Sequence, residues 1–244
     1  MTGNPYDDPS FFAGYATLPR SVHGLDGAPE WPSLRALLPP LAGLDVLDLG
    51  CGHGWFCRHA AGEGARRVLG LDSSRLMLAR AQEANAHPAV AYAHADLEAA
   101  EFPPASFDLA WSSLALHYVE RLEALLARVH AALRPGGALV FSVEHPVYSV
   151  PSRPGWTKAA DGGLSWPVDR YMVEGPRVVE WLGGRVAKRH RLASTTINAV
   201  LRAGFALSHV EEWRPSDAQI AAKPSLAVEL ERPMFLLLAA RRAS

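Results

Sequence analysis

The chain has 244 residues, of which 49% are hydrophobic and 20% are charged, a composition that suits a globular domain with a sizeable buried core. Its 24 Lys and Arg residues nearly balance its 25 Asp and Glu residues, and the basic residues cluster no further than short pairs. This balance argues against a protein that binds nucleic acid or an anionic membrane, because such proteins usually carry a basic excess. A small-molecule partner is therefore favoured.

The cysteine count and the apolar runs bear on the compartment. Cys51 and Cys57 are too few for a disulfide framework and favour a reducing environment. Residues 1–8 lack the basic and then apolar pattern of a signal peptide. The longest apolar runs, at 138–143 and 234–240, are far shorter than the roughly 20 residues that a membrane-spanning helix needs. The sequence predicts a cytoplasmic protein without a membrane span.

From residue 44 onward, short strand-like runs alternate with amphipathic helical stretches. We predict strands at 44–49, 68–72, 90–94, 107–111 and 138–143, and helices at 55–64, 74–85 and 121–133. Ser74 suits the N-cap of the second of these helices. Strands separated by helices of this size favour right-handed crossovers and a parallel sheet covered on both faces.

The alternation breaks after the fifth strand. Residues 146–193 are rich in Pro and Gly and hold three of the seven tryptophans of the chain. A long segment without a regular pattern is usually functional or disordered, and the aromatic content favours an ordered insertion packed on the active edge of the sheet. The pattern then resumes with a helix that Ser194 caps and that ends at Gly204, followed by strands at 205–210 and 234–239.

The most informative residues form a glycine-rich turn at the end of the first strand, Asp48-Leu49-Gly50-Cys51-Gly52-His53-Gly54. Glycines allow close approach of a ligand and positive φ, and the helix that follows offers free N–H groups. Asp72 ends the second strand, where a carboxylate can accept both hydroxyls of a ribose. The third glycine comes two residues after the second, so the turn departs from the G-x-G-x-x-G spacing of dinucleotide sites.

These residues resemble the class I S-adenosylmethionine-dependent methyltransferase family. Five motifs stand in the order of that family: Asp48–Gly54, Asp72, Asp96-Leu97, Phe107-Asp108 and Leu133–Gly137. A run after the fourth strand, Leu116-His117-Tyr118-Val119, is similar to the branch of the family that acts on small molecules. The resemblance covers residues 44–143 well and the terminal strands more loosely.

The resemblance implies S-adenosyl-L-methionine as the cofactor. The methionine part of the cofactor would contact Gly50, Cys51 and Gly52, with no redox role for the cysteine. The ribose would bind Asp72, and the adenine amino group would bind Asp96. The remaining cofactor contacts implied by the resemblance are Ser73, Met77, Leu97, Ser113 and Leu114, with Tyr15 and Arg20 from an N-terminal lid.

Three histidines are candidate catalytic bases, because His is the commonest group to take a proton from a methyl acceptor. His145 leaves the fifth strand at the edge of the cleft, and His190 precedes the last helix. His117 could face the sulfonium of the cofactor. A structural role is the alternative for each of them. The sequence holds no H-x-x-x-H pair or cysteine cluster, so we predict no metal.

We therefore expect one methyltransferase domain over residues 1–244, with an α/β, doubly wound, Rossmann-like fold. Its seven-stranded, mostly parallel sheet would carry helices on both faces. The parts would be an N-terminal helical lid (1–43), a cofactor-binding core (44–145), an acceptor-side insertion (146–193) and a C-terminal helix with the last strands (194–244).

The predicted reaction is transfer of a methyl group by in-line displacement to O, N or C of a small molecule. Two alternatives stay open: other chemistry on the same cofactor fold, and a nucleotide-dependent oxidoreductase. The insertion would form the acceptor pocket, because such pockets are largely apolar; a homodimer interface is the alternative, since Trp and Tyr are enriched there too. The aromatic residues behind both readings are Tyr148, Trp156, Trp166, Tyr171 and Trp181.

Overall fold

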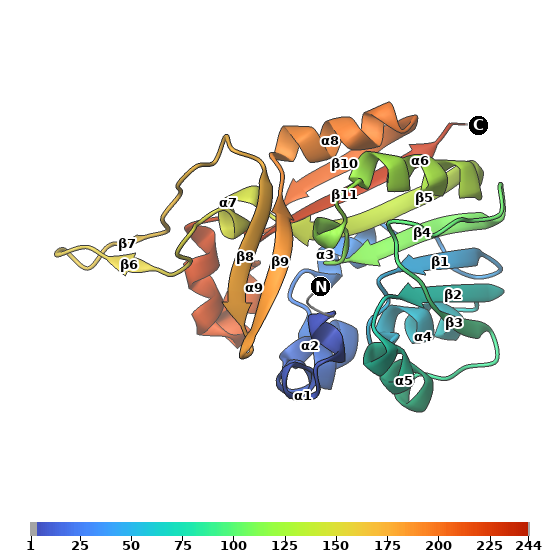
Figure 1. Cartoon of the computed structure of the whole chain (residues 1–244), viewed down its shortest axis with the longest axis horizontal. Coiled ribbons are helices and arrows are strands. Elements are labelled where there is room, and N and C mark those ends of the chain that lie inside the picture. The colour runs from blue at the N-terminus through green and yellow to red at the C-terminus, as the bar shows by residue number, and fades with distance from the viewer. Residues whose placement is uncertain (1–3, 244) are drawn as a thin grey trace.

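The computed structural model describes residues 4–243; residues 1–3 and 244, at the ends of the predicted domain, lie outside the described residues. Its centre is a seven-stranded sheet with the order β10-β11-β5-β4-β1-β2-β3 (Figure 1). The strands are β1 (Asp45–Leu49), β2 (Arg67–Asp72), β3 (Val90–His94), β4 (Phe107–Ser113), β5 (Leu133–Glu144), β10 (Phe205–Glu212) and β11 (Phe235–Arg242). Strands β1 to β5 pair in parallel, and β11 runs antiparallel to both of its neighbours. The predicted doubly wound, mostly parallel sheet is confirmed.

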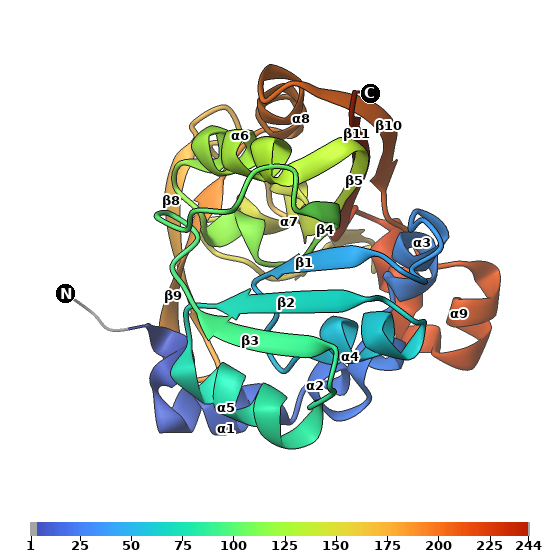
Figure 2. The same ribbon diagram turned by 90° about the vertical axis from the view of Figure 1, so that its right-hand side faces the viewer.

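Helices cover both faces of this sheet, with α6 and α8 on one side and α4 and α5 on the other (Figure 2). The helices of the core are α3 (Trp31–Ala36), α4 (Trp55–Gly62), α5 (Arg75–Ala84), α6 (Leu122–Ala132) and α8 (Ala193–Arg202). The alternation of β1 explains the two layers: Val46 joins the core with α3 and α4, whereas Leu47 and Leu49 join the core with α6.

The chain reaches the sheet through an N-terminal segment of short helices: η1 (Pro5–Asp7), α1 (Pro9–Ala16), α2 (Pro19–Val22) and η2 (Gly24–Gly27). Asp8 caps α1 by accepting the N–H groups of its first turn. The carboxylate of Asp7 accepts the Ser74 hydroxyl at 2.8 Å and the Leu76 N–H at 3.1 Å, both at the start of α5. These bonds fix the N-terminal segment next to the carboxyl end of β2.

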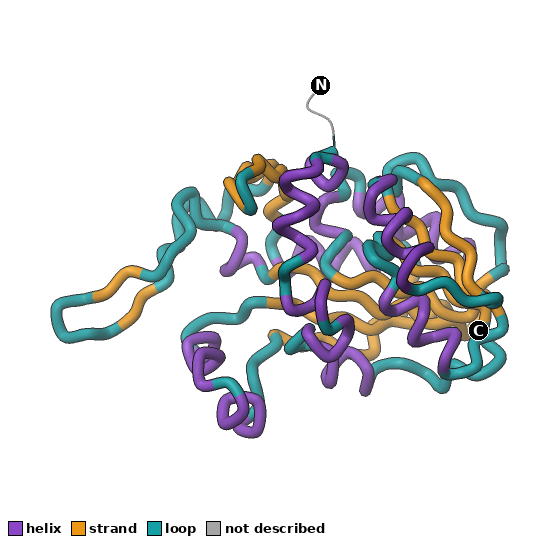
Figure 3. The backbone as a smooth tube through the Cα atoms, turned by 90° about the horizontal axis from the view of Figure 1, so that it is seen from below, coloured by secondary structure: helices purple, strands orange, loops and turns teal. Residues whose placement is uncertain are grey.

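The insertion after β5 is more regular than its sequence indicated. It contains α7 (Pro146–Ser149), the hairpin β6 (Thr157–Lys158) with β7 (Leu164–Ser165), and the hairpin β8 (Gly175–Trp181) with β9 (Gly184–His190). Leu182 and Gly183 connect β8 to β9, both with positive φ, and Leu-Gly lacks the Asn-Gly or Asp-Gly signal by which such turns are recognised. The β6–β7 hairpin projects from the body of the molecule (Figures 1 and 3).

The C-terminal part differs from the prediction at one helix start. Leu192 is the N-cap of α8, so the prediction that Ser194 caps this helix is wrong. The Leu192 N–H donates to the Glu174 carboxylate at 2.7 Å, and this bond from the insertion sets where the helix begins. The sequence also missed α9 (Asp217–Ala222), which has a capping box, and η4 (Pro224–Leu230). Within residues 4–243, no helix is long and apolar enough to cross a membrane.

Candidate active site

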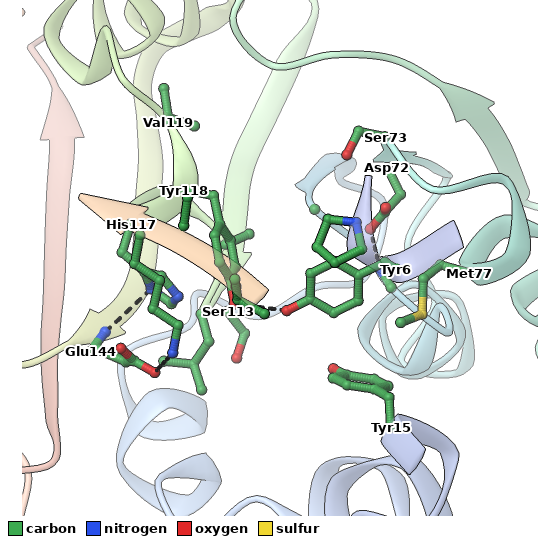
Figure 4. Close-up of a pocket in the computed structure, with 18 of the residues that line it drawn as sticks. Tyr6, Tyr15, Asp72, Ser73, Met77, Ser113, His117, Tyr118, Val119 and Glu144 are labelled. Atoms are coloured by element: carbon green, nitrogen blue, oxygen red, sulfur yellow. Dashed lines mark hydrogen bonds and ion pairs between the residues drawn. The ribbon is translucent and has the colours of Figure 1, made fainter. Parts of the chain in front are cut away.

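A cavity of about 600 Å³ lies at the carboxyl ends of the central strands, between the N-terminal segment and the β8–β9 hairpin. Figure 4 shows Asp72 and Met77 on one side of it and His117 and Glu144 on the other; we name these sides the Asp72 end and the Glu144 end. Most of the residues predicted from the sequence line this cavity: Tyr15, Arg20, Gly50, Gly52, Asp72, Ser73, Met77, Asp96, Leu97, Ser113, Leu114 and His117.

The glycine-rich turn gives the cavity a wall of bare backbone. Gly50 has φ +77°, and a Cβ there would lie 2.3 Å from the Cβ of Ala115, so only glycine fits. Gly52 has φ +53°, and no atom lies within 4 Å of the position that its Cβ would take. The space beside Gly52 is therefore open to a ligand that packs against the backbone.

Two carboxylates mark the Asp72 end. Asp72 accepts the Gly52 N–H on Oδ2 and the Ser74 N–H on Oδ1, both at 2.8 Å. Each oxygen keeps a second lone pair, and burial raises the pKa of this carboxyl. Asp96 accepts the Glu98 N–H at 2.9 Å on Oδ1. Both side chains can still accept hydrogen bonds from a ligand in the cavity.

The end of β4 also faces the cavity through its backbone. Leu114 has φ +53°, a conformation that costs a non-glycine residue about 1 kcal/mol. Its N–H donates to the Ser142 carbonyl at 3.0 Å, which holds the turn in place. Backbone strain of this kind concentrates at ligand sites, and here it brings Ser113 and Leu114 to the cavity wall.

Tyrosines from the N-terminal segment close the cavity over these groups. The hydroxyls of Tyr6 and Tyr118 lie 2.7 Å apart, and the ring of Tyr6 meets the ring of Tyr15 edge to face at 5.5 Å. Burial raises the pKa of all three phenols, so they stay protonated. Arg20 lies near them and donates from Nη2 to Glu30 at 3.0 and 3.3 Å.

The Glu144 end combines an ion pair with a buried histidine. The Lys188 ammonium pairs with the Glu144 carboxylate and lies 5.5 Å from the centre of the Trp181 ring. His117 Nδ1 accepts the Glu144 N–H at 3.4 Å, and its Nε2 is buried without a partner among the described residues. Burial lowers the pKa of His117 to about 4. The neutral ring therefore carries its proton on Nε2 and acts as a donor.

The other predicted residues lie outside the lining of the cavity. His145 is buried. Its Nδ1 accepts the Val147 N–H at 3.1 Å, and its Nε2 lies 2.9 Å from Oε1 of Glu212. His190 is also buried, with Nε2 2.7 Å from the Tyr171 carbonyl. Cys51 belongs to the glycine-rich turn, and its side chain is buried. In both histidines, one ring nitrogen lies within hydrogen-bond distance of a residue on a neighbouring element. Their predicted role as bases stays untested.

The aromatic residues of the insertion lie in different surroundings, and Tyr171 packs on the ring of His190 away from the cavity lining. Tyr148 and Trp181 line the cavity. Trp156 and Trp166 pack with Tyr148 around the buried guanidinium of Arg232, whose carbon lies 4.1–4.9 Å from the three ring centres. This cation–π cluster ties the insertion to the segment before β11. Whether the insertion also forms a dimer interface stays a prediction.

Sequence reasoning missed several residues of the site because their signals are not local. Asn4 and Tyr6 lie in a segment without a motif, and Asn4 reaches the cavity by donating to Ser73 Oγ at 3.1 Å. Lys188 belongs to a strand that the sequence did not predict. Alternation of side chains along 184–190 would have been the one available signal, since it marks a strand.

The chain is similar to known proteins in sequence and in fold. A family model described as a methyltransferase domain matches residues 47–141. The crystal structure of an S-adenosylmethionine-dependent methyltransferase from Mesorhizobium loti is 59% identical and covers 90% of this chain and 100% of that chain, with a TM-score of 0.87. A putative enzyme of the same description from Listeria monocytogenes is 39% identical, covers 91% of this chain and 100% of that chain, and has a TM-score of 0.83.

A further similarity is confined to part of the chain. Over 100 residues, the sequence is 43% identical to a malonyl-[acyl-carrier protein] O-methyltransferase of Erwinia billingiae. This match covers 41% of this chain and 39% of that enzyme. The chain therefore spans about two fifths of the length of that relative.

Proposed function

The chain belongs to the class I S-adenosylmethionine-dependent methyltransferases, and from this premise we propose that it methylates a small molecule bound at the Glu144 end of the cavity. The observation that carries the proposal is that one cavity joins the Asp72 end to the Glu144 end. Methyl transfer needs donor and acceptor side by side, and a cavity of about 600 Å³ lies in the range of small-molecule sites.

The Asp72 end has the groups that S-adenosylmethionine requires. We assign the ribose hydroxyls to Asp72, whose oxygens keep free lone pairs, and the adenine amino group to Asp96. Met77 and Leu97 are buried apolar neighbours for the adenine ring. The open backbone at Gly52 suits the methionine part, and Arg20 can offer its unused N–H groups to the carboxylate of that part.

The bound cofactor supplies an electrophilic methyl group on a sulfonium. The protein then has to hold the acceptor in line with that methyl and to exclude water, and such positioning can be worth about 7–11 kcal/mol. The N-terminal segment and the β8–β9 hairpin serve this purpose, because Tyr6, Tyr15 and Trp181 enclose the space between the two ends.

The acceptor has to be inferred from the cavity itself. The O-methyltransferase of Erwinia billingiae supports transfer to oxygen, but it matches less than half of this chain. Non-methylating chemistry on the same cofactor fold is the alternative function, and the two differ in whether S-adenosylhomocysteine accumulates as an acceptor gains a methyl group.

Calorimetric titration tests the cofactor assignment. We expect binding of S-adenosylmethionine and S-adenosylhomocysteine and none of NAD. The matched variant Asp72→Asn should weaken both titrations. Binding of NAD at micromolar concentration without binding of S-adenosylmethionine would contradict the proposal.

A further inference from the structure

The Glu144 end lacks a free proton acceptor. Nδ1 of His117 accepts a hydrogen bond from the Glu144 N–H, and Nε2 therefore carries the ring proton. Its pKa of about 4, lowered by burial, keeps the ring neutral near pH 7. The Glu144 carboxylate is engaged in an ion pair with Lys188. Of the histidines predicted as bases, His145 and His190 lie outside the cavity lining.

The phenols at this end are donors as well. Burial raises the pKa of Tyr118 and of Tyr148, so neither serves as a base near neutral pH. An acceptor that must lose a proton during transfer, such as an alcohol or an ammonium ion, would need one of these groups to take it. An acceptor that is already an anion needs none.

Hydrogen-bond donors and positive charge gather at the same end. Among the described residues, the Lys188 ammonium makes one hydrogen bond, to Glu144, and an ammonium has three protons to donate. The Nε2–H of His117, more than nine-tenths buried, has no acceptor in the described part of the chain. These groups together suit an oxyanion.

The rest of the Glu144 end is apolar. Its lining includes Trp181, Val186, Met234 and Phe235, of which Val186 and Phe235 are buried. Apolar walls with a few convergent polar groups bind ligands that have an apolar body and one polar head.

We propose that the acceptor is a carboxylic acid with an apolar or aromatic body, whose carboxylate binds Lys188 and the Nε2–H of His117 and is converted to a methyl ester. A carboxylate oxygen forms the new bond to the methyl carbon with its own lone pair. The bond from that carbon to sulfur breaks, its electron pair stays on sulfur, and no proton is released. The inference rests on the proposed function and names the substrate class of the same site.

The Lys188–Glu144 pair allows a test in which the direction of the change in acceptor affinity distinguishes an acid from an amine. A carboxylate competes with Glu144 for Lys188, so Glu144→Gln should tighten its binding and Lys188→Gln should weaken it, by about tenfold or more for a charge-assisted hydrogen bond. An amine would show the opposite signs. Both variants break the same ion pair, and Lys188→Gln also removes the contact with the Trp181 ring, so the melting temperature of each is measured alongside.

The measurement uses the whole protein saturated with S-adenosylhomocysteine and titrated with octanoate, benzoate, octylamine, benzylamine, octanol and benzyl alcohol. With S-adenosylmethionine instead, mass spectrometry identifies the methylated product. We expect binding of the acids and formation of methyl esters. The inference is overturned by methylation of an amine or alcohol, by reversed signs in the two variants, or by no binding of either acid at millimolar concentration. Failure of S-adenosylhomocysteine itself to bind would refute the proposed function and the inference together.

Discussion

Asp72→Ala tests the assignment of the Asp72 end most directly. The substitution removes the acceptor of two backbone N–H groups, those of Gly52 and Ser74, and of the ribose hydroxyls that we assign to this carboxylate. The Ser74 hydroxyl still accepts the Met77 N–H at 3.1 Å, so the start of α5 keeps its cap. We expect a folded variant with weakened cofactor binding.

The magnitude follows from the kind of bond that is lost. A hydrogen bond to a charged group contributes about 1.5–3 kcal/mol, and about 1.4 kcal/mol corresponds to tenfold in a dissociation constant. Calorimetric titration with S-adenosylhomocysteine should therefore show a dissociation constant raised about tenfold to a hundredfold. The free energy of unfolding, measured by thermal unfolding, should change less than the free energy of cofactor binding. The reason is that water in the cavity can accept the hydrogen bonds of the Gly52 and Ser74 N–H groups in place of Asp72.

Asp7→Ala is the matched control. Asp7 also accepts hydrogen bonds from the start of α5, but it does not line the cavity. The control should lower the melting temperature without a comparable loss of cofactor affinity. If Asp72→Ala folds and binds S-adenosylhomocysteine as well as the parent protein does, the ribose assignment is refuted.

Three further predictions concern the turn, a predicted base and acid stability. Gly50→Ala should unfold at a lower temperature than Gly52→Ala, because only the first places a methyl 2.3 Å from the Ala115 Cβ; equal melting temperatures would contradict this reasoning. His145→Ala should lose about 0.5–2 kcal/mol of stability, as expected when a helix cap is removed, whereas a loss of turnover near 100-fold at unchanged stability would support its predicted role as a base. Burial lowers the pKa of His117 from its ordinary 6.5 to about 4, so the stability contributed by the neutral ring is complete above pH 6.5, and about 3 kcal/mol of it is lost as the pH falls to 4. Urea unfolding at pH 7 and pH 4.5 should show this loss in the parent protein and a smaller one in His117→Gln; equal losses would contradict it.

The fold of the core could be predicted because its signals are local. The buried strand that ends at Asp48-Leu49-Gly50 and the acidic residue that ends β2 are written in short, contiguous runs. A parallel sheet buried on both faces needs apolar strands, and helices must cross between them. These constraints determined the strand positions within one or two residues in most cases.

The β8–β9 hairpin could not be predicted in the same way. Its strands are half exposed and carry charged residues, among them Arg185 and Lys188, so their apolar alternation is weak. Their position depends on contacts with η3 (Leu116–Tyr118), which is distant in sequence. The N-terminal segment is similar, because Tyr6 is held by partners distant in sequence, among them Tyr118 and Ser74.

The histidines show what residue type alone does not reveal about a candidate base. His145, next to the end of β5, was the natural candidate, yet the buried start of α7 needs its Nδ1 as a cap. His117 does reach the cavity, but one backbone N–H determines its tautomer and makes it a donor. The Glu144 end, which offers donors and holds its carboxylate in an ion pair, favours an acceptor that arrives as an anion. The choice of acceptor would then lie with the insertion, which supplies Lys188, while the strand ends that the sequence revealed would serve the cofactor.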